Sequence, residues 1–431
     1  MRELQTRKLS NGVTILCETT EDDMSYIGIG FKVGSRDELS PEKYGIAHCV
    51  EHMMFKSTKN RTGKEASKEL DNLGVISNAY TDIDKTVYHS ECHIKDFNKV
   101  VDIMFDQILN HLFDENELEL EKDIIHQEFV SNLSDPYYIF SSKVCESIFN
   151  SPYGHQILGD INSIKKFKKE DLEDFYQRNY TSNRCVISFV GKLTINQLVK
   201  ILSPYCYKLN FGTEYNHPVT GYTYNINKKL HISGLKQNNV TIFGAPISLK
   251  ERNYNKIKAV MYCLNFTLSN GMSSRLCKRI REELGLVYNI YASFYSVGDL
   301  ETPLIGFTSD KDPYMVIREI DKVLKEIING DITTEELLKS KRQLEISLMI
   351  KNRELNNIYL IRLEDYLCGE ILTDKESKEL LKKIETVTQK DIVNLAKRLY
   401  GKYGLIIGSS TNSLCKKFQD YLNSVFKSKR G

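Results

Sequence analysis

The chain has 431 residues, and its 59 lysines and arginines nearly balance its 57 aspartates and glutamates. The formal net charge of +2 disfavours a nucleic-acid binder, because such proteins attract phosphates through a marked excess of positive charge. Hydrophobic residues make up 41% of the chain, with only 8 prolines and 24 glycines, which disfavours disorder and indicates a globular protein of two or three domains.

The sequence carries no recognisable targeting or membrane-spanning segment. Residues 1–8 lack the apolar core of a signal peptide, and the longest apolar runs, such as 186–190, are too short to cross a membrane. The ten cysteines show no CxxC spacing, which is typical of reduced, buried thiols. We therefore expect a cytoplasmic protein with no membrane span and no nucleic-acid partner.

The first half alternates short apolar strands with amphipathic helices. An Asn11-Gly12 turn predicts an opening hairpin, because Asn-Gly supplies the positive φ angles of tight turns. Alternating apolar residues predict strands, and apolar residues three and four apart predict helices. The expected strands are 4–10, 13–18, 25–33, 77–88 and 184–190, and the expected helices are 41–55, 64–73, 96–110, 114–133 and 171–180.

The order of elements repeats in the second half, after a polar passage over 213–228 that we interpret as a linker. We therefore predict an α+β fold of two similar domains, 1–212 and 229–431, each an antiparallel-rich mixed sheet packed against helices. In the second domain the expected strands are 231–233, 240–243, 287–296, 304–308 and 404–407. The expected helices are 253–268, 274–283, 315–329, 334–368, which we expect to be broken, and 389–400.

The sharpest motif is His48-Cys-Val-Glu51-His52. Positions i, i+3 and i+4 of a helix share one face, so the motif projects two imidazoles and a carboxylate together. Two histidines at this spacing bind one Zn²⁺, and the carboxylate accepts a proton from metal-bound water. A helix that exposes two histidines by chance is the alternative, but with only 9 histidines in the chain this coincidence is rare.

A catalytic zinc needs a third protein ligand, and the acidic helix around 115–128 offers candidates. Glu121 and Glu128 are seven residues apart and so lie on one face of this helix. Their spacing alone does not decide between a ligand and a solvated acidic surface. For three further carboxylates on this helix we expect solvated side chains: Glu115, Glu117 and Glu119.

The sequence resembles the M16 (pitrilysin-type) zinc metallopeptidases, and within them the short mitochondrial-processing-peptidase-like group. The resemblance extends along nearly the whole chain and includes the His48–His52 motif with its tail to Thr58. The other segments that carry the resemblance are 9–16, 78–81, 121–128, 151–159, 271–276 and 281–288.

The resemblance implies a role for each residue of the metal site. Glu128 would be the third zinc ligand beside His48 and His52, Glu51 the general base, and Glu121 a carboxylate that supports the site. The segment of the second half that corresponds to the motif helix, 260–266, has no histidine. We therefore expect one Zn²⁺ per chain.

Two further elements follow from the resemblance. Arg281 and Tyr288 would assist catalysis, since a guanidinium and a phenol can stabilise an oxyanion; taken alone, they read as a surface charge and a core aromatic. The segment Asn78, Ala79, Tyr80 and Thr81 would be an exposed edge strand to which an extended substrate adds, and otherwise an interior strand. A second metal site at 89–93 is disfavoured.

The resemblance implies a zinc endopeptidase for short unstructured peptides or leader peptides. Each chain would form half of a clamshell chamber, completed by a second copy in a homodimer or by a related subunit in a heterodimer. The alternative is a non-catalytic or partner-dependent subunit of a heterodimeric complex, which the intact motif disfavours.

Overall fold

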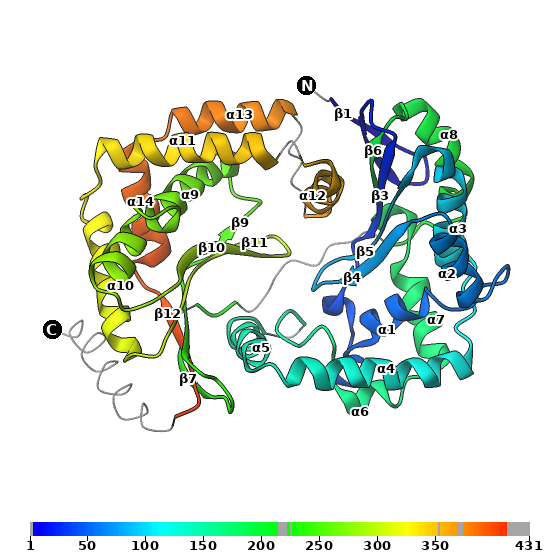
Figure 1. Ribbon diagram of the computed structural model, residues 1–431, viewed down its shortest axis with the longest axis horizontal. Coiled ribbons are helices and arrows are strands. Elements are labelled where there is room, and N and C mark those ends of the chain that lie inside the picture. Colours follow the sequence, from blue (N-terminus) through cyan, green and yellow to red (C-terminus); the bar gives the residue numbers. More distant parts are fainter. Residues whose placement is uncertain are drawn as a thin grey trace. The chain divides into compact units, whose positions relative to one another are not determined.

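The computed structural model describes residues 3–150, 152–213, 222–224, 226–351, 354–368 and 374–411. The chain forms two compact units, each with one mixed sheet and helices packed on it (Figure 1). Unit 1 comprises Met1–Ser131, Ser151–Pro218 and Ile350–Ser377, and unit 2 comprises Asn132–Asn150, Val219–Met349 and Lys378–Gly431.

The sheet of unit 1 has the strand order β1-β2-β6-β3-β5-β4. Neighbouring strands are antiparallel except β2 and β6, which are parallel. The strands are β1 (Leu4–Lys8), β2 (Thr14–Thr19), β3 (Met24–Phe31), β4 (Ile76–Thr81), β5 (Thr86–His93) and β6 (Cys185–Gly191).

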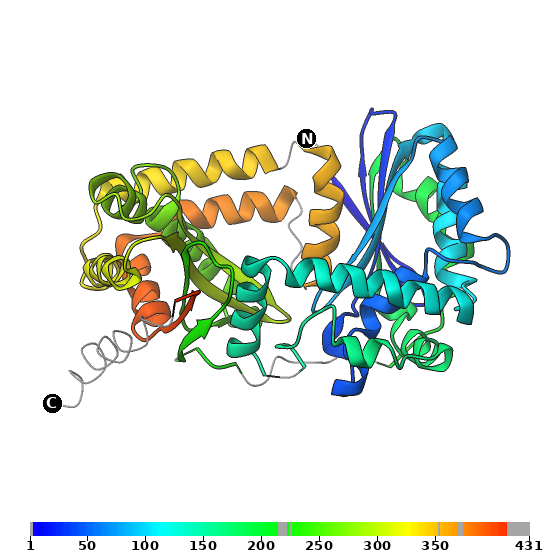
Figure 2. The same ribbon diagram turned by 60° about the horizontal axis from the view of Figure 1, so that its bottom comes forward.

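Helices cover both faces of this sheet, with α3 and α8 on one face and α12 on the other (Figures 1 and 2). Short 3₁₀ turns occur at Ser35–Asp37, Pro41–Lys43, Ile94–Asp96 and Ser182–Arg184. The helices of unit 1 are α1 (Ile46–Met53), α2 (Gly63–Asn72), α3 (Phe97–Leu109), α4 (Glu115–Leu133), α6 (Ile161–Ile164), α7 (Lys169–Asn179), α8 (Ile195–Cys206) and α12 (Leu355–Leu367).

Strand β3 shows how the sequence fits two covered faces. Ile27 and Ile29 are fully buried in the main core, on the side of α3 and α8. Glycine occupies the alternate positions, because α12 approaches the strand closely there. A Cβ atom at Gly30 would lie 2.8 Å from Cδ1 of Leu367 and 3.0 Å from Cδ2 of Leu363.

The sheet of unit 2 repeats this topology, with the order β10-β11-β8-β12-β7. Strands β12 and β7 are parallel and the other neighbours are antiparallel, so the parallel pair falls where β6 and β2 lie in unit 1. The expected pair of similar mixed sheets is confirmed. The strands are β7 (Asn227–His231), β8 (Asn238–Phe243), β9 (Ile247–Ser248), which pairs with β11, β10 (Ile290–Val297), β11 (Leu300–Ser309) and β12 (Gly404–Ser409).

The helices of the second sequence half follow the order of the first, with α12 packed on the sheet of unit 1. A π-helical segment, η5 (Cys277–Glu283), replaces the regular helix expected over 274–283. The helices are α9 (Tyr254–Ser269), α10 (Pro313–Ile328), α11 (Thr334–Lys351), α13 (Asp374–Glu385) and α14 (Gln389–Tyr400).

The two units exchange one helix each. Helix α5 (Pro136–Ile148) comes from the first half of the sequence but belongs to unit 2, where Phe140 packs against Gly408 of β12. Helix α12 comes from the second half and belongs to unit 1. The compact units are therefore not contiguous stretches such as 1–212 and 229–431. Most of the expected linker, at 214–221 and 225, lies outside the described residues.

Several expected elements differ in detail. The single strand expected over 77–88 is a hairpin, because residues 82–85 turn the chain between β4 and β5. The helix expected from 41 begins at Ile46, because Gly45 has a φ of 96°, which a right-handed helix cannot contain. The opening hairpin is confirmed, with a positive φ at Gly12 and a loop over 9–13.

Helices α5, α6, α8 and α13 are absent from the expected set. The capping box formed by Thr194 and Gln197 is a sequence signal for the start of α8. In the part of the chain that the structure describes, no helix is both long and apolar enough to cross a membrane.

A buried ion pair fixes α12 on the sheet of unit 1. Nε of Arg362 donates to Oε1 of Glu18 on β2 at 2.6 Å, and both side chains are almost fully buried. Removing one partner of a buried pair leaves the other charge without compensation. We predict that Glu18→Ala lowers the free energy of unfolding by about 3–5 kcal/mol, measured by urea denaturation.

The control is Arg178→Ala, which removes the exposed pair between Arg178 and Asp174 on α7. This change should cost less than about 0.5 kcal/mol. Equal unfolding midpoints for the two variants would show that the buried pair does not stabilise unit 1.

Candidate metal centre

A buried carboxylate, that of Glu38, binds the N-terminus of helix α1, which carries the His48–His52 motif. Glu38 accepts hydrogen bonds from the backbone N–H groups of Gly45 (2.9 Å) and Ala47 (3.0 Å). His155 contacts the same carboxylate, with Nε2 at 2.7 Å from Oε2. Burial raises the pKa of Glu38, and these hydrogen bonds oppose the shift. A carboxylate at a helix N-terminus satisfies free amides and complements the helix dipole.

Two imidazoles and one carboxylate converge between α1 and α4. Nε2 of His48 lies 3.7 Å from Oε2 of Glu128, and Nε2 of His52 lies 3.5 Å from the same oxygen. One potential ligand atom from each of these three residues lies within 4.8 Å of the others. Two imidazole nitrogens and a carboxylate oxygen are the donors of many catalytic zinc sites, so the residues fit this metal.

Glu121 orients the ring of His52. Its Oε1 lies 2.8 Å from Nδ1 of His52, and its Oε2 contacts Nζ of Lys56. Nδ1–H donating to a carboxylate leaves the lone pair of Nε2 free to bind a metal. Burial raises the pKa of Glu121, but the contacts to His52 and Lys56 outweigh it and hold the pKa below its ordinary value.

The two histidines have different surroundings. Burial, followed by the neighbouring His52, lowers the pKa of His48 to about 4. Burial also opposes protonation of His52, but hydrogen bonds to Glu121 and Glu128 outweigh it and raise its pKa to about 9. The rings meet edge to face, with centroids 4.5 Å apart.

Glu51 lies on the same helix as the histidines, with only 7% of its surface exposed. Oγ1 of Thr81 donates to its Oε2 at 2.5 Å. Burial raises the pKa of Glu51, and the bond from Thr81 opposes that shift. A buried carboxylate with a raised pKa suits a group that accepts and returns a proton near neutral pH.

The acidic face of α4 is only partly solvated. Glu117 accepts from the backbone N–H (2.9 Å) and the hydroxyl (2.7 Å) of Ser57, so the expectation of a solvated side chain is wrong for this residue. The exposed Glu119 pairs with the largely buried Lys122 (2.6 Å), and Glu115 is exposed in the first turn.

The segment Asn78–Thr81 lies in β4, the edge strand of the sheet, and not in its interior. Asn78 pairs with His89 of β5 and Thr81 with Thr86, so β4 has a ladder partner on one side within its sheet. The hydroxyl of Tyr80 donates to Glu364 of α12.

Arg281 and Tyr288 lie together in unit 2. The guanidinium of Arg281, at the end of η5, sits 5.1 Å from the centroid of the Tyr288 ring. Tyr288 is 82% exposed, so its interpretation as a core aromatic is wrong. An exposed phenol and a guanidinium form a pair of donors on the surface of this unit.

The histidines of β5 do not join a metal cluster. Nδ1 of His89 lies 2.9 Å from the hydroxyl of Tyr359 on α12, and His93 accepts from the backbone N–H of Lys95. Within the described ranges, His48, His52 and Glu128 form the sole group of three or more histidine, cysteine, aspartate or glutamate side chains placed to bind a metal ion.

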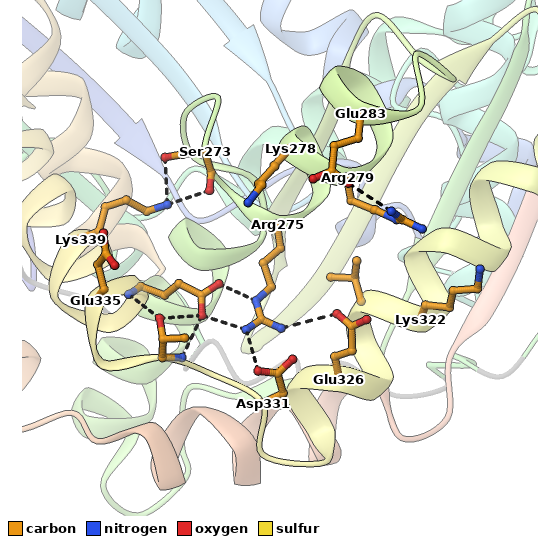
Figure 3. A pocket seen from close by; sticks show the side chains of 13 residues that line it. Ser273, Arg275, Lys278, Arg279, Glu283, Lys322, Glu326, Asp331, Glu335 and Lys339 are labelled. Carbon is orange, nitrogen blue, oxygen red and sulfur yellow. Dashed lines mark hydrogen bonds and ion pairs between the residues drawn. The ribbon is translucent and has the colours of Figure 1, made fainter.

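A cavity of about 510 Å³ in unit 2 is polar but internally paired (Figure 3). Arg275 forms two hydrogen bonds to Glu336 (2.7 and 2.8 Å) and lies near Glu326 and Asp331. Lys339 donates to the carbonyl of Ser273. These contacts tie the loop before η5 to α10 and α11, which indicates a structural role.

Three supporting residues of the metal centre were not identified in the sequence: Glu38, Lys56 and His155. Helical spacing gives no signal for Lys56, because α1 ends at Met53 and Lys56 lies in the loop that follows it. The contacts of Glu38 join segments far apart in sequence, and no local pattern predicts them.

Two sequence models of one peptidase family match the chain. The first, described as Insulinase (Peptidase family M16), matches residues 13–160 and so includes the metal cluster. The second, described as Peptidase M16 inactive domain, matches residues 166–344. The chain belongs to peptidase family M16.

Three relatives are similar along most of their length. An "Uncharacterized zinc protease" of Rickettsia felis is 29% identical, over 91% of this chain and 94% of the relative. The zinc protease YmxG of Bacillus subtilis is 28% identical, over 94% of this chain and 98% of the relative. The mitochondrial-processing peptidase subunit beta of Saccharomyces cerevisiae is 27% identical, over 90% of this chain and 87% of the relative.

Two solved structures share the fold. A protease from Helicobacter pylori aligns with a TM-score of 0.83 and 18% identity, over 95% of this chain and 100% of that one. The periplasmic protease PqqL of Escherichia coli aligns with a TM-score of 0.81 and 18% identity, over 96% of this chain but only 48% of its own. The expected two-domain M16 architecture is confirmed.

The role of Glu121 can be tested through metal affinity. We predict that Glu121→Ala weakens zinc binding by about 10- to 100-fold, because Nδ1 of His52 loses the carboxylate that orients its ring. The measurement is competition with a chromophoric chelator. The control is Glu119→Ala, which removes an exposed carboxylate from the same helix. This variant should bind zinc like the wild type. Equal affinities for both variants would contradict the proposed support.

Proposed function

We propose that this chain is a zinc-dependent endopeptidase that hydrolyses short unstructured peptides or leader peptides. The observation that carries the proposal is the convergence of His48, His52 and Glu128, with the buried carboxylate of Glu51 on the same helix as the histidines. The names of the relatives as zinc proteases support the same conclusion.

The mechanism assigns a task to each side chain. His48, His52 and Glu128 would hold one Zn²⁺ per chain, which polarises a water molecule or the substrate carbonyl when bound. Glu51 accepts the proton of the attacking water and returns it to the leaving amine. Glu121 keeps the imidazole of His52 in the orientation that metal binding needs.

The edge strand β4 would bind the substrate. An extended peptide adds to such an edge through main-chain hydrogen bonds, which tolerate many side chains. Asn78, Ala79, Tyr80 and Thr81 would supply this edge. Most extended segments of a folded protein already have their main-chain groups paired, so unstructured peptides are the substrate class that suits this edge.

Arg281 and Tyr288 would bind the scissile carbonyl and the backbone of the substrate. Tyr288 is exposed and Arg281 is partly exposed, with its Nε 3.3 Å from Oε1 of Glu282, so both groups remain accessible to a ligand. Hydrogen-bond donors that face a developing oxyanion lower the barrier of acyl transfer.

We further propose that two chains complete one cytoplasmic peptide chamber as a homodimer. A relative named as a beta subunit, and a PqqL chain of which this chain covers 48%, support assembly from paired units of this size. Light scattering on the purified, active protein should give the mass of two chains. An inactive preparation that a related subunit activates would instead establish a heterodimer.

The central test is Glu51→Gln, which preserves the size of the side chain but removes the base. We predict unchanged zinc content and a loss of peptide cleavage of at least about 100-fold, measured with a fluorogenic peptide library. Glu119→Gln, on the surface of α4, is the matched control and should cleave like the wild type.

Cleavage by Glu51→Gln at the wild-type rate would refute the mechanism. Carefully purified wild-type protein that holds no stoichiometric zinc and cleaves no peptide would favour the second candidate, a non-catalytic subunit of a heterodimeric complex. The complete set of three potential ligands argues against that candidate.

A further inference from the structure

The carboxylate of Glu51 is tied to the edge strand by one hydroxyl. Thr81 is the last residue of β4, and its Oγ1 donates to Oε2 of Glu51 at 2.5 Å. Among the described residues, Thr81 is the sole hydrogen-bond partner of this carboxylate, and Oε1 carries no such bond. The bond thus selects one oxygen of the base and leaves the other to a reacting group.

The strand that supplies this hydroxyl is itself held on its opposite face. Successive residues of a strand point to opposite sides of the sheet, so Tyr80 and Thr81 face different layers. Tyr80 donates to Glu364 of α12, whereas Thr81 contacts α1. The end of β4 is thereby fixed from both sides.

The same residue belongs to the proposed docking edge. In the sheet order, β4 follows β5 and ends the sheet, so its other side is the one to which a peptide would add. Thr81 therefore combines a main chain in the docking strand with a side chain on the proposed base. In the part of the chain that the structure describes, Thr81 alone therefore links the strand that would bind a peptide to the carboxylate of Glu51, the proposed base.

We propose that Thr81 is a positioning residue for the reaction. Its hydroxyl would hold Oε2 of Glu51, so that Oε1 faces the attacking water and stays aligned with the strand that binds the peptide. The inference rests on the proposed peptidase function, and it assigns to the side chain of Thr81 a task separate from main-chain binding of substrate.

The test compares Thr81→Val with Thr81→Ser in the full-length protein. Valine has the shape and strand preference of threonine but no hydroxyl, whereas serine keeps the hydroxyl. We expect Thr81→Val to lower kcat by about 10- to 100-fold, the loss of one hydrogen bond to a charged group. Its KM and zinc content should stay within about twofold of wild type, because the main chain of β4 and the metal ligands are unchanged.

The rescue by Thr81→Ser separates positioning from a merely structural role. This variant should recover kcat to within about threefold of wild type, since the donor returns at the same atom. Thr86→Val is the matched control, because Thr86 lies directly opposite Thr81 and its hydroxyl donates to the carbonyl of Val33 at 2.9 Å. Its kcat should match that of the wild type.

Each failure has its own signature. A wild-type protein that neither holds zinc nor cleaves peptides defeats the proposed function itself. A cleaving wild type with an equal kcat for Thr81→Val overturns the inference alone, as does a change confined to KM. If Thr81→Val does not fold, Thr81→Ala, which only removes atoms, provides the same comparison with Thr81→Ser.

Discussion

Three carboxylates of α4 hold the end of α1 and the loop that follows it. Glu117 accepts from Ser57, Glu121 contacts His52 and Lys56, and Glu128 faces both histidines. This row of contacts brings together two helices that lie far apart in the sequence. The metal cluster, the orientation of His52 and the position of Glu51 all depend on it, because each requires α1 to keep its place beside α4.

The sequence predicts the local part of this site and not its long-range part. The spacing of His48, Glu51 and His52 defines one helix face, which is a local property. Glu128 could be selected only through the family resemblance, since its partners are 76 and 80 positions away in the printed sequence. The hydroxyl that donates to Glu51 belongs to Thr81 of strand β4, so only the folded structure reveals this contact.

The same limit applies to the fold. Strands and helices with clear periodicity were predicted, as were the two similar mixed sheets. The β4–β5 hairpin was missed because the sequence pattern of the whole segment is that of one continuous strand. In the structure, the polar turn at 82–85 divides this segment into two paired strands. The membership of α5 and α12 depends on which surface each helix covers, and periodicity describes a helix face without naming its partner.

The exchange of α5 and α12 affects how this protein can be divided. Each sequence half contains most of one sheet but lacks the helix that covers part of it, such as the face formed by Gly28 and Gly30. A fragment that ends near residue 212 would expose that glycine-lined surface to water. The halves should therefore recover their structure by fragment complementation, and a gene that encodes only one of them would not yield an autonomous domain.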